Sequence, residues 1–148
     1  MYLKSIITKT SFSSCRLVKI KYQTIDMSEL VPYTEDHLRI KDVLIKGAKR
    51  KSVINYTNLL KQSGVHLDMS NPHDRGVLGN LLGDISWNEV QEGRPMLSSG
   101  ALHAGDFKQG GGFFDLAEEL YSISLPSADA ELKFGMDEMN KTHEFWSK

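Results

Sequence analysis

Side chains that could do chemistry gather between Glu89 and Lys108. Asp106 and Lys108 have the Asp-x-Lys spacing of metal-dependent nucleases, with Glu89 as an upstream carboxylate. In such sites acidic oxygens hold Mg²⁺ and the lysine polarises phosphate or water. A match this short arises readily by chance, and a catalytic pair of this kind normally lies on a rigid strand rather than in a glycine-rich loop. A small metal-dependent nuclease or toxin-like effector is therefore an alternative interpretation.

The same stretch holds the residue types of a hydrolytic triad. Ser98 or Ser99 could act with His103 and Asp106. No Gly-x-Ser-x-Gly elbow holds either serine, however, so nothing in the sequence positions a nucleophile. We predict no catalytic residues and favour a non-enzymatic protein, although enzymatic activity stays open.

Composition limits the other possibilities. The chain has 148 residues, 40% hydrophobic and 25% charged, with a formal net charge of −1, as in a globular protein with a single domain. Its one cysteine, Cys15, excludes an internal disulfide and a multi-cysteine zinc site and predicts a reducing, cytoplasmic setting. His66, His73 and His103 lack partners at ligand spacing, so no metal site and no cofactor are predicted. No apolar run is long enough to cross a membrane.

The N-terminal residues differ from the rest. Residues 1–25 contain five cations, many hydroxyl side chains and no acid, a bias that resembles an organellar transit peptide. The favoured alternative is an upstream extension, because Met27 is followed by a sequence typical of a cytosolic start. We therefore predict a basic, flexible extension over residues 1–26 and a single domain over 27–148.

A first helix is predicted after Thr34, which precedes Glu35 and Asp36. Its expected buried residues are Leu38, Ile40, Val43, Leu44 and Ile45. The helix ends in a basic run that includes Lys49, Arg50 and Lys51. Cations suit a helix C-terminus, so the run is either a solvated helix end or a phosphate-contacting cluster.

Two further helices are predicted from their caps. Asn55 is the expected N-cap of a helix over 56–62 that stops at Gly64. Asn71 followed by Pro72 predicts the start of a third helix. The apolar stripe of this third helix comprises Val77, Leu78, Leu81, Leu82 and Ile85. Gly76, Gly79 and Gly83 flank that stripe. Because each costs about 1 kcal/mol in a helix interior, they favour close packing against a neighbouring backbone.

The second half begins with a predicted strand over 95–104 and a loop over 105–112. A helix over 113–121 follows, and Ser127 begins a final helix that ends near Trp146. One face of that last helix comprises Leu132, Met136, Met139, His143 and Trp146.

This order of elements predicts an α+β, winged-helix-like fold, mainly helical with a small β-hairpin or sheet. In a winged helix the third helix enters the DNA major groove and the hairpin tip contacts the backbone. The DNA-contacting residues predicted in this way are Lys49, Arg50, Lys51, Tyr56, Arg75, Asn80 and Lys108. Arg94 and Pro95 are expected to hold the helix-to-strand corner, with Arg94 paired to Glu89 or Glu92. Phe113 and Phe114 are expected to anchor the wing.

Two resemblances bear on this prediction. The segments VINYTNLLKQSGV and DRGVLGNLLGDI resemble the helix-turn-helix of the alkylguanine-DNA alkyltransferase family. The resemblance implies that Tyr56 is the phosphate-turning tyrosine and Arg75 the intercalating arginine. An extra residue separates Arg75 from Gly79, and the Pro-Cys-His-Arg acceptor site is missing. Since Cys15 lies outside the domain, alkyl acceptance is excluded.

The second resemblance spans residues 54–121. The phrase LLGDISWNEVQEGRPMLSSGALHAGDFKQGGGFFDLAEEL is similar to small, largely uncharacterised prokaryotic proteins. Their shared core reads I-S-x-x-E, G-R-P-(M/L)-L-S and G-x-G-F-F, and it implies no particular activity. The prediction is thus a non-enzymatic DNA-binding or regulatory accessory protein of prokaryotic type. Its partner would be double-stranded DNA, or a protein if the chain is an interaction module, with no membrane association.

Overall fold

Side-chain caps begin four of the five α-helices in the computed structural model, which describes residues 30–148. The caps are Thr34, Asn55, Asn71 and Ser127, each accepting a hydrogen bond from a backbone N–H group of the first turn. In chain order the elements are α1 (Glu35–Lys49), β1 (Ile54–Asn55), α2 (Tyr56–Ser63), α3 (Pro72–Gln91), the 3₁₀ helix η2 (Leu97–Gly100), β2 (Ala101–Leu102), α4 (Gly111–Tyr121) and α5 (Ala128–Trp146). The helix starts predicted at all four caps are confirmed.

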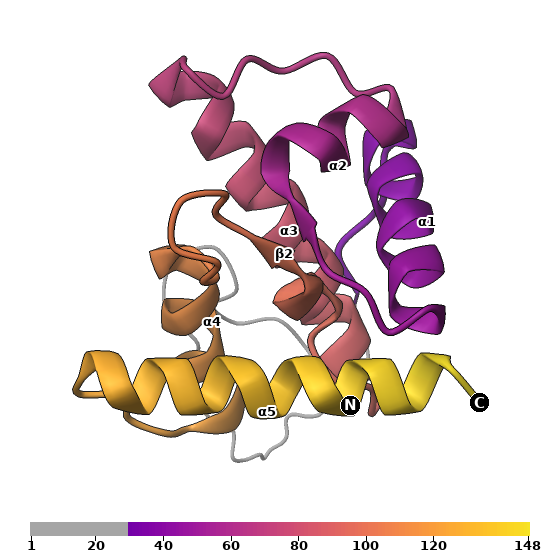
Figure 1. The fold of residues 1–148 in the computed structure, drawn as a ribbon. Coiled ribbons are helices and arrows are strands. Elements are labelled where there is room, and N and C mark those ends of the chain that lie inside the picture. The colour runs from indigo at the N-terminus through magenta and orange to yellow at the C-terminus, as the bar shows by residue number, and fades with distance from the viewer. Residues whose placement is uncertain (1–29) are drawn as a thin grey trace. The chain divides into compact units, whose positions relative to one another are not determined.

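Residues 32–148 form one compact unit. Its apolar centre lies among α1, α2, α3 and η2, and includes Ile40, Leu44, Leu59, Leu78, Leu81, Ile85 and Leu97. Helix α5 crosses below α4 and below the end of α3 in the view of Figure 1, and it packs against η2 and α1. The basic extension predicted over residues 1–26 lies outside the described residues.

The sheet is smaller than predicted and differs in direction. β1 and β2 pair in parallel, with Ile54 opposite Ala101 and Asn55 opposite Leu102. The strand predicted over 95–104 is wrong except at Ala101 and Leu102, because residues 97–100 form the 3₁₀ helix η2. The fold is therefore α+β and mainly helical. A winged-helix arrangement is not confirmed, since a wing is an antiparallel hairpin and this pair is parallel.

Several predictions of burial are wrong. Leu38 on α1 is 55% exposed, and Leu132 and Met136 on α5 are exposed as well. The buried face of α5 carries Gly135, Glu138 and Thr142, together with His143, which was predicted to lie on that face. This polar face follows from what it covers. Part of η2 and the preceding backbone present N–H and C=O groups that apolar side chains could not satisfy.

Two glycines of α3, Gly76 and Gly79, do not pack closely as predicted. Outside the backbone of its own helix, a Cβ atom at either position would meet no atom of the described residues within 4 Å. Close packing occurs at Gly135 of α5 instead, where a Cβ would overlap the side chain of Gln109. Gln109 is buried and donates from Nε2 to the carbonyl oxygens of Ser99, at 2.8 Å, and Gly135, at 3.3 Å.

We expect Gly135→Ala to lower the free energy of unfolding by about 1–3 kcal/mol, the usual effect of overpacking a filled interior. The added methyl group would displace Gln109 from the two carbonyls that it satisfies. Gly79→Ala is the matched control, because it adds the same methyl group to an open site. The control should raise stability by up to about 1 kcal/mol through helix propensity. Urea denaturation of both variants tests this, and equal shifts would contradict it.

Candidate functional site

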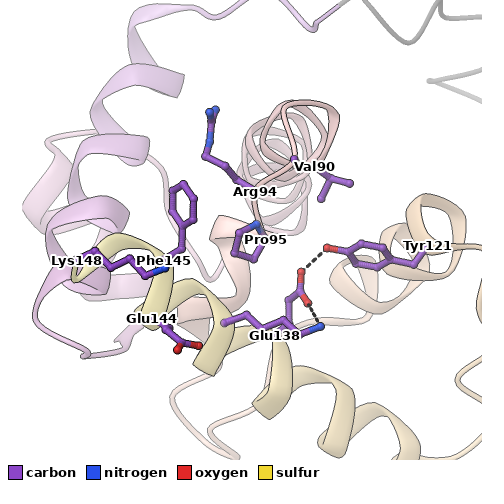
Figure 2. Close-up of a pocket in the computed structure, with 10 residues that line it drawn as sticks. Val90, Arg94, Pro95, Tyr121, Glu138, Glu144, Phe145 and Lys148 are labelled. Carbon is purple, nitrogen blue, oxygen red and sulfur yellow. Dashed lines mark hydrogen bonds and ion pairs between the residues drawn. The ribbon is translucent and has the colours of Figure 1, made fainter.

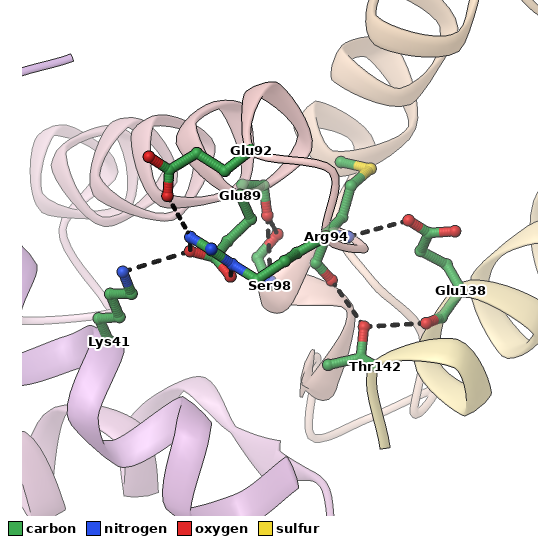
Figure 3. Close-up of polar contacts among 9 residues, drawn as sticks. Lys41, Glu89, Glu92, Arg94, Ser98, Glu138 and Thr142 are labelled. Atoms are coloured by element: carbon green, nitrogen blue, oxygen red, sulfur yellow. Dashed lines mark hydrogen bonds and ion pairs between the residues drawn. The ribbon is translucent and has the colours of Figure 1, made fainter. Parts of the chain in front are cut away.

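The end of α3 carries a fully buried carboxylate. Glu89 accepts two hydrogen bonds from Arg94, from Nε at 2.8 Å and from a terminal guanidinium nitrogen at 2.9 Å. Lys41 of α1 lies 3.2 Å from the same carboxylate, and Arg94 also reaches Glu92 at 2.6 Å. The hydrogen bonds to Glu89 hold the pKa of Arg94 above its usual value. Figure 3 shows these side chains converging on the corner between α3 and η2, so Arg94 pairs with both glutamates suggested by the sequence.

Hydroxyl and carboxylate groups extend this network toward α5. The Ser86 and Ser98 hydroxyl oxygens lie 2.6 Å apart, which joins α3 to η2. Thr142 donates to the carbonyl oxygen of Met96, and Glu138 accepts the Met96 N–H at 2.9 Å (Figure 3). These contacts satisfy the polar backbone at the start of η2. The network thus joins α1, α3, η2 and α5 through internal ion pairs and hydrogen bonds.

A cavity of about 400 Å³ opens beside this network. Val90, Pro95 and Phe145 line it together with Tyr121 and Glu138, and the hydroxyl of Tyr121 donates to the Glu138 carboxylate (Figure 2). Burial, followed by this hydrogen bond, raises the pKa of Tyr121. One Glu138 oxygen therefore accepts two hydrogen bonds, and the other lies 4.0 Å from Lys141. These partners indicate a structural carboxylate rather than a general base.

The chemistry that the sequence offered as alternatives does not assemble here. Glu89 is neutralised by two cations, whereas Asp106 is exposed in the loop before α4. The described residues contain no group of three His, Cys, Asp or Glu side chains able to hold a metal ion. Ser99 is buried against Thr142 at 3.0 Å, and His103 is exposed and packs edge-on against Tyr56. The nuclease and hydrolase interpretations therefore gain no support.

The predicted DNA-contacting residues separate into groups. Lys49, Arg50 and Lys51 lie together, exposed, at the C-terminal end of α1. Arg75 and Asn80 are exposed on the first half of α3. Figure 1 shows the start of α3 at the upper left and the end of α1 at the lower right of the molecule. One straight duplex segment would not easily contact both groups.

Three of these predicted residues also have internal partners. Arg75 donates to the carbonyl oxygen of Met69 at 2.9 Å. The Tyr56 hydroxyl accepts the Gly110 N–H at 3.1 Å, and burial raises its pKa. Lys108 pairs with Glu131 at 3.3 Å. These interactions tie loops to helices.

The Phe pair packs as an anchor for α4. Phe114 is buried and Phe113 half-buried, with their rings edge-to-face at 5.2 Å. Phe113 also contacts Phe134 of α5, with ring centroids 6.1 Å apart.

The end of α1 is an unusual helix terminus. Lys51 has φ of 55°, and its N–H donates to Ala48, while the Ser52 N–H donates to Gly47. This is the Schellman motif, whose left-handed position glycine normally occupies. A lysine there costs about 1 kcal/mol or more in backbone strain. Lys49, Arg50 and Lys51 make no ion pair with any described residue.

A smaller cavity of about 240 Å³ lies beside this basic run. Arg50, Asn58, Gln62, His103 and Phe107 line it, over apolar side chains that include Val43, Ile54 and Leu102. We call this cavity the basic groove, because Arg50 is charged and no acid of residues 30–148 lines it.

Phe107 is the least expected side chain of the basic groove. Its φ is 53°, a conformation in which bulky residues are outliers, and the residue is 74% exposed. The loop is closed by hydrogen bonds from Phe107 N–H to His103 and from His103 N–H to Lys108. Left-handed strain costs about 1–3 kcal/mol, and burial of the ring offsets little of it. Such strain is typical of residues kept for binding.

One buried pair of polar residues was not predicted from the sequence. His37 and Asp84, both buried, are 2.9 Å apart. The Thr34 N–H donates to His37 Nδ1, so Nε2 carries the proton donated to Asp84. The spacing of Thr34 and His37, three apart as in a capping box, was the available signal.

Comparisons with protein-family models, with curated proteins and with solved structures found no match to this chain. Within residues 30–148, no helix combines the length and apolar character needed to span a bilayer.

Proposed function

We propose that the protein is a non-enzymatic nucleic-acid-binding protein that acts as a DNA-binding or regulatory accessory factor. The observation that carries the proposal is the run Lys49–Lys51, three consecutive exposed cations without an ion-pair partner in the described structure. Arg50 lines the basic groove, and none of the described residues that line it is acidic. Phosphodiester backbones are the polyanions that such runs commonly bind.

The helix terminus does not prevent this binding. The C-terminal end of an α-helix carries about half a negative charge, and three cations outweigh it. The cations therefore leave positive potential for a phosphate group after they complement the helix dipole. Lys46, one turn earlier, is instead paired with Asp42 at 2.9 Å.

The winged-helix form of the proposal, with α3 in a major groove, has weaker support. Asp68 and Asp74 lie near Arg75, and the Arg75 guanidinium is hydrogen-bonded to Met69. We therefore assign the main contact to the end of α1 rather than to α3.

The proposal is tested by fluorescence anisotropy with labelled DNA, single-stranded and duplex, over a range of salt concentrations. Binding should weaken as salt rises. Replacing Lys49, Arg50 and Lys51 with alanine should lower the logarithmic salt slope by about 2–3, since each lost phosphate contact removes about 0.7–0.9. Replacing Lys133 and Lys141 of α5, and Lys148 just beyond its end, with alanine removes the same charge and should change the slope little. Salt-independent binding would contradict the proposal.

Lys51→Gly separates binding from folding. Relief of the left-handed strain should raise the free energy of unfolding by up to about 1 kcal/mol, whereas loss of the cation should weaken DNA binding. Ser122→Gly is the matched control, because Ser122 has φ of 54° at the end of α4. The control should gain stability without losing affinity. Unchanged DNA affinity in Lys51→Gly would count against a role for this residue.

A further inference from the structure

We infer that the basic groove receives an unpaired base of a single-stranded nucleic acid, with Phe107 as the surface on which the base stacks. This inference rests on the proposed function and names its ligand class. It concerns the recess between the end of α1, the start of α2 and the loop that carries Phe107.

The size of the recess limits its ligand. At about 240 Å³ it is smaller than the roughly 300–1,000 Å³ of pockets for drug-sized molecules. One planar ring system fits this scale, whereas a duplex does not enter a recess unless a base leaves its stack. The groove therefore favours strands whose bases are already unpaired.

The chemistry of the lining matches a nucleotide. The exposed phenyl ring of Phe107 offers a stacking face, and every base has a complementary π-face. Asn58 and Gln62 lie one turn apart on α2 and line the groove, and their side chains make no hydrogen bond with any described residue. Amides can both donate to and accept from the edge of a base.

The cations beside the groove indicate where the phosphate group of the bound nucleotide would lie. Arg50 lines the groove, with Lys49 and Lys51 adjacent in the chain. A strand whose base stacks on Phe107 would then run its backbone along these cations. A peptide would use the apolar floor equally well, but nothing in the groove lining would pair with its positive side chains.

The experiment compares a labelled single strand with the same strand annealed to its complement. The strand has about 16 nucleotides, the upper end of the site sizes covered by one single-strand-binding OB fold. Phe107→Ala should weaken single-strand binding by roughly 5- to 150-fold, the range reported for loss of one base–aromatic stack, and should leave duplex binding within about twofold. Phe107→Tyr should retain binding, whereas Phe107→Leu, which keeps the apolar bulk without the ring, should not. Asn58→Ala should reduce single-strand binding further.

Phe145→Ala is the matched control, because Phe145 is 40% exposed on α5 and lines the cavity beside Glu138. It should bind both DNA forms as the unchanged protein does. If single strand and duplex bind with equal affinity and Phe107→Ala changes neither, the inference is overturned while the proposed function stands. If neither the single strand nor the duplex binds even at low salt, the inference and the proposed function are both overturned. The groove would then be assigned to a protein partner.

Discussion

Replacing Glu89 with alanine should lower the free energy of unfolding by about 3–5 kcal/mol, as when one partner of a buried ion pair is removed. The carboxylate is fully buried and is shared by Arg94 and Lys41, whose side chains are themselves largely covered. Without it, two cations would be left close together with little solvent. Guanidinium denaturation, with the slope checked for two-state behaviour, measures the loss.

Glu92 is the control for this change. It also pairs with Arg94, but its side chain is 45% exposed. Exposed pairs contribute about 0–1 kcal/mol, so Glu92→Ala should have a small effect. Similar losses in the Glu89 and Glu92 variants would mean that the buried pair does not hold the corner. The Glu89 variant should also retain DNA affinity at temperatures where it is folded, since the proposed contact surface lies elsewhere.

Replacing Glu138 with alanine should cost about 2–4 kcal/mol, because each buried donor left without an acceptor costs about 1–3 kcal/mol. The donors are the Met96 N–H, which is buried, and the Tyr121 hydroxyl, which is half-buried. Thermal and urea unfolding should agree on the sign.

Two variants make this prediction specific. Glu138→Gln keeps an acceptor oxygen at the same place and should recover much of the loss. Glu144→Ala changes an exposed carboxylate that lines the same cavity, and should shift stability by less than about 0.5 kcal/mol. If the alanine and glutamine variants of Glu138 were equally unstable, hydrogen bonding would not explain the role of this residue.

The sequence predicted the helices well because their signals are local. A side-chain oxygen at Asn55 or Ser127 decides a helix start through contacts three residues away. Gly64, at φ of 76°, likewise ends α2 as predicted. Local chemistry of this kind does not depend on the rest of the fold.

The strand and the buried face of α5 could not be predicted in the same way. Residues 97–100 form η2 because Ser98 and Ser99 find partners in Ser86 and Thr142, which lie far away in the chain. Thr142 lies on α5, whose buried face is therefore partly polar, so the predicted apolar face was wrong at Leu132 and Met136 although His143 is buried. Tertiary hydrogen bonds overrode the propensity of the segment.

The candidate site was predicted in part. Lys49–Lys51 is contiguous and could be read directly, but its relation to Arg75 depends on the direction of α3. The residues around Phe107 do not indicate a positive φ, since glycine is the residue expected in that conformation. The recess itself joins segments from both halves of the chain.

Because the recess joins segments from both halves of the chain, it forms late during synthesis of the protein. Ile54 pairs with Ala101, so closing this part of the groove joins residues separated by on the order of 50 positions, which is slow relative to local helix formation. During synthesis α1 and its basic run emerge well before Phe107 does. A partly made chain therefore has the basic run proposed to contact phosphate, without the recess proposed to receive an unpaired base. Selective binding would begin only after the second half of the chain has folded.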